Sequence, residues 1–248
     1  LYRKAFGTMT YDPESITITN NHLYDIASIT KIASSTLAAM HLVHKGSLAI
    51  NNSLKTYLPE LTRSSPYGNI NITEMMCHQA GLQAFIPFYK NTLSNGLPSS
   101  NHYSTIQSES FPTTVADNLY LKAGYRDSMY AQILSKPLQE KKYLYSDLCY
   151  YFLQPILEKL GQSKQDSYVA ETFYKPMGLR YIGYHPLKRF PRNQIVATEN
   201  DQYFRKQLLW GHVHDPGAAM LGGVGGHAGL FSNATDLAQI MQLFLNNG

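Results

Sequence analysis

A helical apolar pattern begins directly after residue 28, and it constrains the fold of this chain more than any other feature. Apolar residues recur at the spacing of one helical face, at Ile32, Ala33, Leu37, Met40 and Val43. Lys45 and Gly46 then supply a C-terminal stop signal. The pattern predicts a helix from Ile29 to Lys45 that is buried on one side, with Ser28 at its mouth.

The other segments carry different patterns. Residues 1–20 alternate between short apolar and polar groups around Asp12-Pro13, which is typical of a β-hairpin. Residues 64–136 are rich in Ser, Asn, Pro and Tyr and predict short helices joined by long surface loops. Two more helices are expected: one over 148–160, apolar almost all round and interrupted by Pro155, and one over 237–245, capped by Asn246-Asn247-Gly248.

Composition narrows the classes of function. A chain of 248 residues is long enough to bury a real core. The net charge is +4 and the basic residues are scattered, which gives nucleic-acid binding little support. No apolar run approaches the ~20 residues of a membrane span. Because the chain begins with Leu1 rather than Met, we expect any export signal to lie outside the printed sequence.

Ser28 and Lys31 are the first candidates for catalysis. They lie one helical turn apart, so the lysine amine can reach the serine hydroxyl on the same face. Free N–H groups and the positive end of the helix dipole favour a developing negative charge at Ser28. The same field disfavours an ammonium ion, which makes the amine of Lys31 a usable base. The alternative is a core helix whose first turn happens to hold these two residues.

Tyr145-Ser146-Asp147 directly precedes the predicted helix at 148. A tyrosine beside a lysine amine can hold or relay a proton, and Asp147 can bond both Lys31 and a substrate amide. The alternative is a capping turn, with Ser146 or Asp147 as the N-cap.

The segment His212-Val213-His214-Asp215 sets several metal-binding side chains within four residues. Such a run can begin a zinc or binuclear hydrolase site. A metal-dependent hydrolase that uses His212 and His214 is therefore an alternative function.

Together these motifs resemble the serine β-lactamase and penicillin-binding-protein superfamily, whose signatures are Ser-x-x-Lys, Tyr-x-Asn and a later Lys/His-Thr/Ser-Gly strand. Three further segments look like family segments in the same order: MMCHQAGL (75–82), KPMGL (175–179) and GGHAGLFSNATDLAQIM (225–241). The likeness is greatest to class C β-lactamase-like hydrolases, of a type sometimes fused to a family-three β-N-acetylglucosaminidase. It spans nearly the whole chain.

The resemblance implies an α/β (α+β) fold, in which an antiparallel sheet is flanked by helices and accompanied by a mainly helical region. It implies one incomplete domain over 1–248, with 1–27 as the N-terminal hairpin of the sheet and 28–248 as the mainly helical region with long loops. By the same likeness, the C-terminal strands, which carry the third motif and half of the oxyanion hole, are expected to be missing after Gly248.

The resemblance also implies an activity: a serine hydrolase that works through an acyl-enzyme, as an esterase, a D-amino-acid-type peptidase or a weak β-lactamase. Ser28 would be the nucleophile, Lys31 the base and Tyr145 the proton relay. Asp147 and His227 would orient Lys31 or the substrate. No metal or cofactor is called for.

The resemblance favours an exported protein, periplasmic or associated with the outer membrane, acting on a small molecule or a peptidoglycan fragment. We expect no nucleic-acid partner, and a fused glycosidase domain is an alternative neighbour. Because of two departures from the family, a non-catalytic module attached to a glycosidase remains an alternative. Asp147 stands where the family has Asn, and His227-Ala228-Gly229 lacks the hydroxyl residue of the third motif.

Overall fold

In the computed structural model, which describes residues 2–246, the segment after Ser28 folds into the predicted helix. The helix begins at Ile29, continues as a π-helical stretch over Lys31–Thr36, and ends as α1 (Leu37–His44). The turn that follows contains Lys45 and Gly46. The predicted helix and its stop signal are therefore confirmed.

The buried face of this helix differs from the prediction. Ala33 and Leu37 are buried as expected, but the side chains of Ile32, Met40 and Val43 are exposed. A π-helical turn holds more residues than the about 3.6 of an α-helical turn, so the stretch over 31–36 rotates every later side chain away from the expected register. The prediction of a single apolar face is therefore wrong for Met40 and Val43, and Ile32, at the start of the stretch, is exposed as well.

Helix α6 (Leu148–Gly161) lies at the centre of the apolar core and is buried almost all round, as predicted. Pro155 lies inside the helix and has no N–H to donate to the carbonyl of Tyr151, four residues earlier. The Tyr130 hydroxyl donates to that carbonyl instead, at 2.7 Å. A neighbouring helix thus satisfies the group that the proline leaves free.

The remaining elements are short. The other helices are α2 (Leu54–Tyr57), α3 (Pro59–Thr62), α4 (Ile72–Met76), α5 (Tyr125–Leu134), α7 (Gln165–Val169), α8 (Pro216–Met220) and α9 (Ala234–Leu245). The strands are β1 (Tyr24–Asp25), β2 (Leu93–Ser94), β3 (Leu97–Pro98), β4 (Tyr103–Ser104), β5 (Thr113–Ala116), β6 (Leu119–Leu121), β7 (Ala197–Asn200), β8 (Leu208–Trp210) and β9 (Phe231–Ser232). They pair as small antiparallel sheets, β1-β9, β2-β3, β4-β6-β5 and β7-β8. The predicted mixed α/β class is confirmed.

The interpretation of residues 64–136 as helices and loops missed the β4-β6-β5 sheet. Strands β5 and β6 are joined by a tight turn in which Asn118 has φ +50°. Asparagine tolerates this left-handed conformation better than most residues, so the turn signal was present in the sequence. The flanking strands are short and partly polar, which hides their alternating pattern.

At the N-terminal end, residues 7–18 pair with each other around the predicted turn at Asp12-Pro13. Met9 N–H donates to the carbonyl of Ile16, and Ser15 N–H donates to that of Asp12, both at 3.0 Å. At the other end, α9 begins earlier than predicted, because the Asn233 side chain accepts a hydrogen bond from the N–H of Asp236. Of the predicted C-terminal cap, Asn246 ends the helix, and Asn247 and Gly248 lie outside the described residues.

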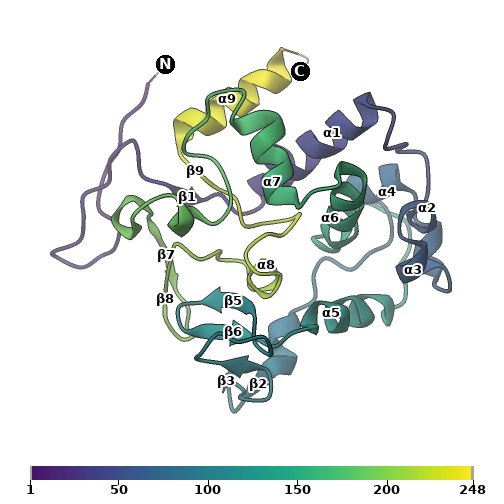
Figure 1. Cartoon of the computed structure of the whole chain (residues 1–248), viewed down its shortest axis with the longest axis horizontal. Coiled ribbons are helices and arrows are strands. Elements are labelled where there is room, and N and C mark those ends of the chain that lie inside the picture. The colour runs from purple at the N-terminus through teal and green to yellow at the C-terminus, as the bar shows by residue number, and fades with distance from the viewer. Residues whose placement is uncertain (1, 247–248) are drawn as a thin grey trace.

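Helix α8 lies between a group of helices and a group of small sheets (Figure 1). Helices α1, α7 and α9 lie together on the side where both ends of the chain emerge, and the sheets β2-β3 and β4-β6-β5 lie on the opposite side (Figure 1). Helix α8 lies between them and contacts β5. Within residues 2–246, no helix has both the length and the apolar character needed to cross a bilayer.

Candidate active site

Ser28 lies in a turn that the preceding strand holds in place. Ala27 has φ +45°, a left-handed conformation that a residue with a Cβ rarely adopts. The Asp25 carboxylate stabilises this turn, because Oδ1 accepts from Ala27 N–H at 2.7 Å and Oδ2 accepts from His214 N–H at 2.6 Å. The Ser28 side chain is exposed, so its hydroxyl is open to a ligand.

Lys31 brings its amine to Ser28 from within the protein. Nζ lies 2.7 Å from Ser28 Oγ and 3.3 Å from the backbone carbonyl oxygen of His227. It also lies 2.7 Å from Asp147 Oδ1, as an ion pair rather than an aligned hydrogen bond. Only 4% of the lysine side chain is exposed. The structure therefore brings Ser28, Lys31 and Asp147 together.

Tyr145 contacts this cluster through its ring. The centre of the ring lies 4.9 Å from Lys31 Nζ, a cation–π distance, and the side chain is exposed on its other side. Among the described residues, the Tyr145 hydroxyl makes no hydrogen bond to Ser28 or Lys31. The structure thus places the ring of Tyr145 beside the amine, without a direct hydrogen bond from its hydroxyl to either residue.

His78 holds the turn over residues 144–147 in place, although the sequence predicted no role for this residue. His78 Nδ1 accepts a hydrogen bond from Ser146 N–H at 3.0 Å, and its carbonyl accepts from Leu144 N–H at 2.9 Å. Its ring packs on that of Tyr145 with the centres 4.6 Å apart. Ser146 Oγ bonds Leu148 N–H at the start of α6, so the expected capping turn is present as well.

Protonation of His78 is expected to disturb this turn. Desolvation, helped by the charge of Lys31, lowers the pKa of His78 below its ordinary 6.5. The neutral ring therefore stabilises the folded state fully above pH 6.5, and that contribution is lost as the pH falls through the lowered pKa. We expect the rate at which Ser28 reacts with a covalent probe to fall over the same acidic pH range, which gives the rate–pH profile an acid limb. In His78→Asn, which keeps an acceptor and tolerates the left-handed φ of +57°, the limb should disappear from the rate–pH profile; an unchanged limb would assign it to another group.

His227 contributes to the site in a different way from the one predicted. Its backbone carbonyl faces Lys31, whereas its side chain is buried, with 2% of the residue exposed. Nε2 lies 2.8 Å from Asp215 Oδ1, and the ring stacks on Tyr151 at 4.7 Å between centres. Burial opposes ionisation of Asp215, but His227 and the N–H of Ala218 outweigh it and lower the pKa of Asp215 to about 2.

The loop that carries His227 depends on close backbone packing. A Cβ at Gly229, which has φ +117°, would lie 2.3 Å from the carbonyl oxygen of Gly223. A Cβ at Gly226 would lie 2.7 Å from the carbonyl oxygen of Tyr150. These glycines let the loop approach α6 and bring the His227 carbonyl to the amine of Lys31.

The alternative metal site is not assembled. His212 pairs with Asp117 at 2.9 Å, His214 with Glu199 at 3.1 Å, and Asp215 with His227. Within residues 2–246, no three His, Cys, Asp or Glu side chains converge as a set of metal ligands. Neighbours in sequence are thus directed to different partners, and this geometry does not favour a metal-dependent hydrolase.

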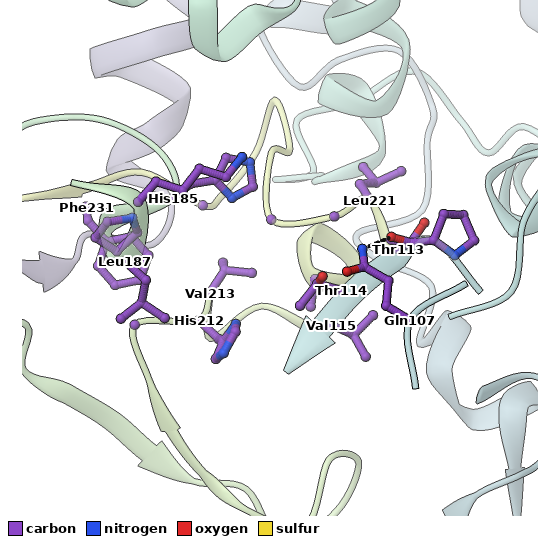
Figure 2. A pocket seen from close by; sticks show the side chains of 18 residues that line it. Gln107, Thr113, Thr114, Val115, His185, Leu187, His212, Val213, Leu221 and Phe231 are labelled. Carbon is purple, nitrogen blue, oxygen red and sulfur yellow. Dashed lines mark hydrogen bonds between the residues drawn. The ribbon is translucent and has the colours of Figure 1, made fainter. Parts of the chain in front are cut away.

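Two cavities adjoin the loop over residues 222–229. The larger, of about 580 Å³, is flanked by His185, Leu187 and Phe231 on one side and by Thr113 and Thr114 of β5 on the other (Figure 2). None of Ser28, Lys31, Tyr145 and Asp147 lines it. The second cavity, of about 440 Å³, is lined by Asp147 and His227, so it is the one that borders the candidate catalytic residues.

A serine hydroxyl thus lies in contact with a buried lysine amine one helical turn away, in a mixed α/β fold. The chain belongs to the beta-lactamase family, whose model, described as Beta-lactamase, matches residues 2–248. The resemblance inferred from the sequence motifs is therefore confirmed.

Relatives agree with this assignment. The chain is 32% identical over 267 residues to "Putative D-alanyl-D-alanine carboxypeptidase" of Salmonella agona (strain SL483), with 100% of this chain and 56% of that protein covered. Two solved structures share the fold at low identity. An octameric penicillin-binding protein homologue from Pyrococcus abyssi has a TM-score of 0.67 at 17% identity, with 100% of this chain and 50% of that chain covered. A D-amino acid amidase from Ochrobactrum anthropi SV3 has a TM-score of 0.62 at 14% identity, with 94% and 58% covered. The chain thus spans about half the length of these relatives.

Proposed function

We propose that the protein hydrolyses small amides or esters through an acyl-enzyme on Ser28. The observation that carries this proposal is the 2.7 Å contact between Ser28 Oγ and a lysine amine that is almost fully buried. The names of the relatives, a D-alanyl-D-alanine carboxypeptidase and a D-amino acid amidase, favour derivatives of D-amino acids, including fragments of the cell wall, as substrates.

Acylation would use the contacts of Lys31. With its amine neutral, Lys31 takes the proton of Ser28 as Oγ attacks the substrate carbonyl. The ammonium that forms is stabilised by the Asp147 carboxylate and the His227 carbonyl oxygen. The Ser28 N–H, which has no hydrogen-bond partner among the described residues, would donate to the oxygen that gains negative charge.

The second half of the reaction would use Tyr145. The bond between the carbonyl carbon and the leaving nitrogen or oxygen breaks as Tyr145 passes a proton from Lys31 to the leaving group. Water then attacks the acyl carbon while its proton passes through Tyr145 to the neutral Lys31, the bond between that carbon and Ser28 Oγ breaks, and Lys31 returns the proton to Oγ. The packing of Tyr145 against Lys31 on one side and its exposure on the other support this role.

The setting of the enzyme is part of the same proposal. We propose an exported protein, periplasmic or associated with the outer membrane, that acts on peptidoglycan fragments or related small molecules. A glycosidase domain on the same chain would supply such fragments. We also retain the division into an N-terminal hairpin over 1–27 and a mainly helical region over 28–248.

Covalent labelling tests the proposed nucleophile. We expect a fluorophosphonate to add one adduct to the full-length, unsubstituted protein. Peptide mass spectrometry should place that adduct on Ser28. Ser28→Ala should abolish labelling because no other hydroxyl contacts Lys31 Nζ among the described residues. Ser47→Ala, which changes an exposed serine after α1, is the matched control and should leave labelling unchanged. Absence of labelling in the unaltered protein would favour the non-catalytic module.

A further inference from the structure

The cavity of about 440 Å³ beside the site has an aromatic wall. Phe85, Tyr89, Tyr151 and Tyr203 line it, and the rings of Tyr89 and Tyr203 lie 5.7 Å apart. Asp147 belongs both to this wall and to the cluster around Lys31. A substrate whose carbonyl reaches Ser28 would therefore place its acyl substituent in or near this cavity.

Where the cavity borders the candidate catalytic residues, its polar side chains are hydrogen-bond acceptors. Asp147 holds Lys31 through Oδ1 and stays partly exposed. Both hydrogen bonds that Asp215 accepts, from His227 and from Ala218, use Oδ1. The second oxygen of each carboxylate is thus left for a ligand. With its pKa lowered to about 2, Asp215 is ionised and has no proton to donate.

His227 adds an unsatisfied polar atom at the same cavity. The residue lines the cavity, is 2% exposed, and its Nδ1 has no hydrogen-bond partner among the described residues. Because Nε2 lies 2.8 Å from Asp215 Oδ1, Nδ1 is the ring nitrogen left without a partner within residues 2–246. A buried polar atom without a partner is costly, so it points to a group supplied by a ligand.

We infer that the acyl part of the substrate carries a free primary ammonium group, which this acidic and aromatic cavity binds. An ammonium ion has three donors and no acceptor, and it is attracted both to carboxylates and to aromatic faces. Lys90, also in the wall, is exposed, so water screens its repulsion. The substrate class is then an amino-acid amide or ester with an unblocked amino group. The inference rests on the proposed function of Ser28.

Protection of Ser28 from labelling tests the inference without requiring turnover. The rate of fluorophosphonate labelling would be measured with phenylalaninamide, N-acetylphenylalaninamide or 3-phenylpropanamide present as competitor. Both enantiomers of the first two compounds would be used. We expect the free amine to protect at a concentration about tenfold or more below that of its acetylated and des-amino counterparts. Equal protection by the three, or better protection by an uncharged compound, would overturn the inference and leave the nucleophile intact. Absence of labelling without competitor would instead overturn the proposed function.

Variants locate the binding groups. In Asp215→Asn the ratio between the protecting concentrations of the free and acetylated amides should approach one. Because Asp215 also caps α8, the fold of this variant must first be verified by circular dichroism. Phe85→Ala supplies an independent test. Phe85 is 65% exposed at the cavity, so its loss removes an aromatic face and little packing. Phe6→Ala, at 66% exposure and outside the cavity, is the matched control. An unchanged ratio in both Asp215→Asn and Phe85→Ala would contradict the assignment.

Discussion

Replacement of Lys31 by methionine should slow the reaction of Ser28 with a fluorophosphonate by about 10²- to 10⁴-fold, the range that general base catalysis contributes. Methionine has a similar length but cannot take the proton of the serine hydroxyl. The amine that it replaces is 2.7 Å from Ser28 Oγ, so the variant tests the contact on which the proposed mechanism depends. The measurement is the second-order rate of labelling at fixed pH.

Two further variants make this result interpretable. Lys31→Met alone leaves Asp147 Oδ1 buried without its cation, which is expected to destabilise the fold. Lys31→Met combined with Asp147→Asn removes both charges and should restore stability while the labelling rate stays low. Lys45→Met, at the exposed end of the same helix, should react at the normal rate. If Lys31→Met labelled as fast as Lys45→Met, another group would be the base.

Arg205→Met is expected to cost about 3–5 kcal/mol of the free energy of unfolding, the range found when one partner of a buried ion pair is removed. The side chains of Arg205 and Asp201 are both 0% exposed, with Arg205 Nε 2.8 Å from Asp201 Oδ2. The guanidinium also donates to the carbonyls of Val213 and His214, directly before Asp215. The variant should therefore weaken the active-site loop as well as the core, which urea denaturation and the labelling rate would measure together.

A second arginine–aspartate pair provides the comparison. Arg192 bonds Asp117 through two nitrogens, at 2.6 and 2.9 Å, but both side chains are substantially exposed. Exposed pairs contribute at most about 1 kcal/mol, so Arg192→Met should shift the urea midpoint far less than Arg205→Met. Equal shifts would mean that burial does not decide the contribution of Arg205.

Sequence patterns predicted the long elements of the fold and missed details that depend on tertiary contacts. The helix after Ser28 and the final helix were recognisable from apolar periodicity, and the buried helix at Leu148 was recognisable because it is apolar almost all round. The π-helical stretch was not, because an additional residue in one turn changes the register without leaving a local signal. Sheet β4-β6-β5 was missed because its strands are short and partly polar.

The candidate site divides in the same way. Ser28 and Lys31 could be paired from sequence because three positions on a helix bring two side chains together. Tyr145 and Asp147 could be joined to them only by side-chain chemistry and family resemblance, because no local rule connects residues so far apart in the chain. His78 and Asp215 were given no catalytic role, although His78 lay in a quoted motif and Asp215 in the suspected metal run. Their functions depend on partners, Ser146 and His227, that only the folded chain supplies.

The contacts of Lys31 also have a consequence for how the chain acquires activity. The hydrogen bond from Lys31 Nζ to the His227 carbonyl joins residues separated by 196 positions in sequence. Contacts at such separation form only after long stretches of chain have been closed into loops, and they are slow compared with helix formation. An intermediate with its helices formed would therefore carry Ser28 and Lys31 one turn apart, but without the long-range contacts that fix the turn at Ser28 and the amine of Lys31. The onset of covalent labelling during refolding would mark the late docking of the glycine-rich loop, not the earlier formation of the helix that carries the serine.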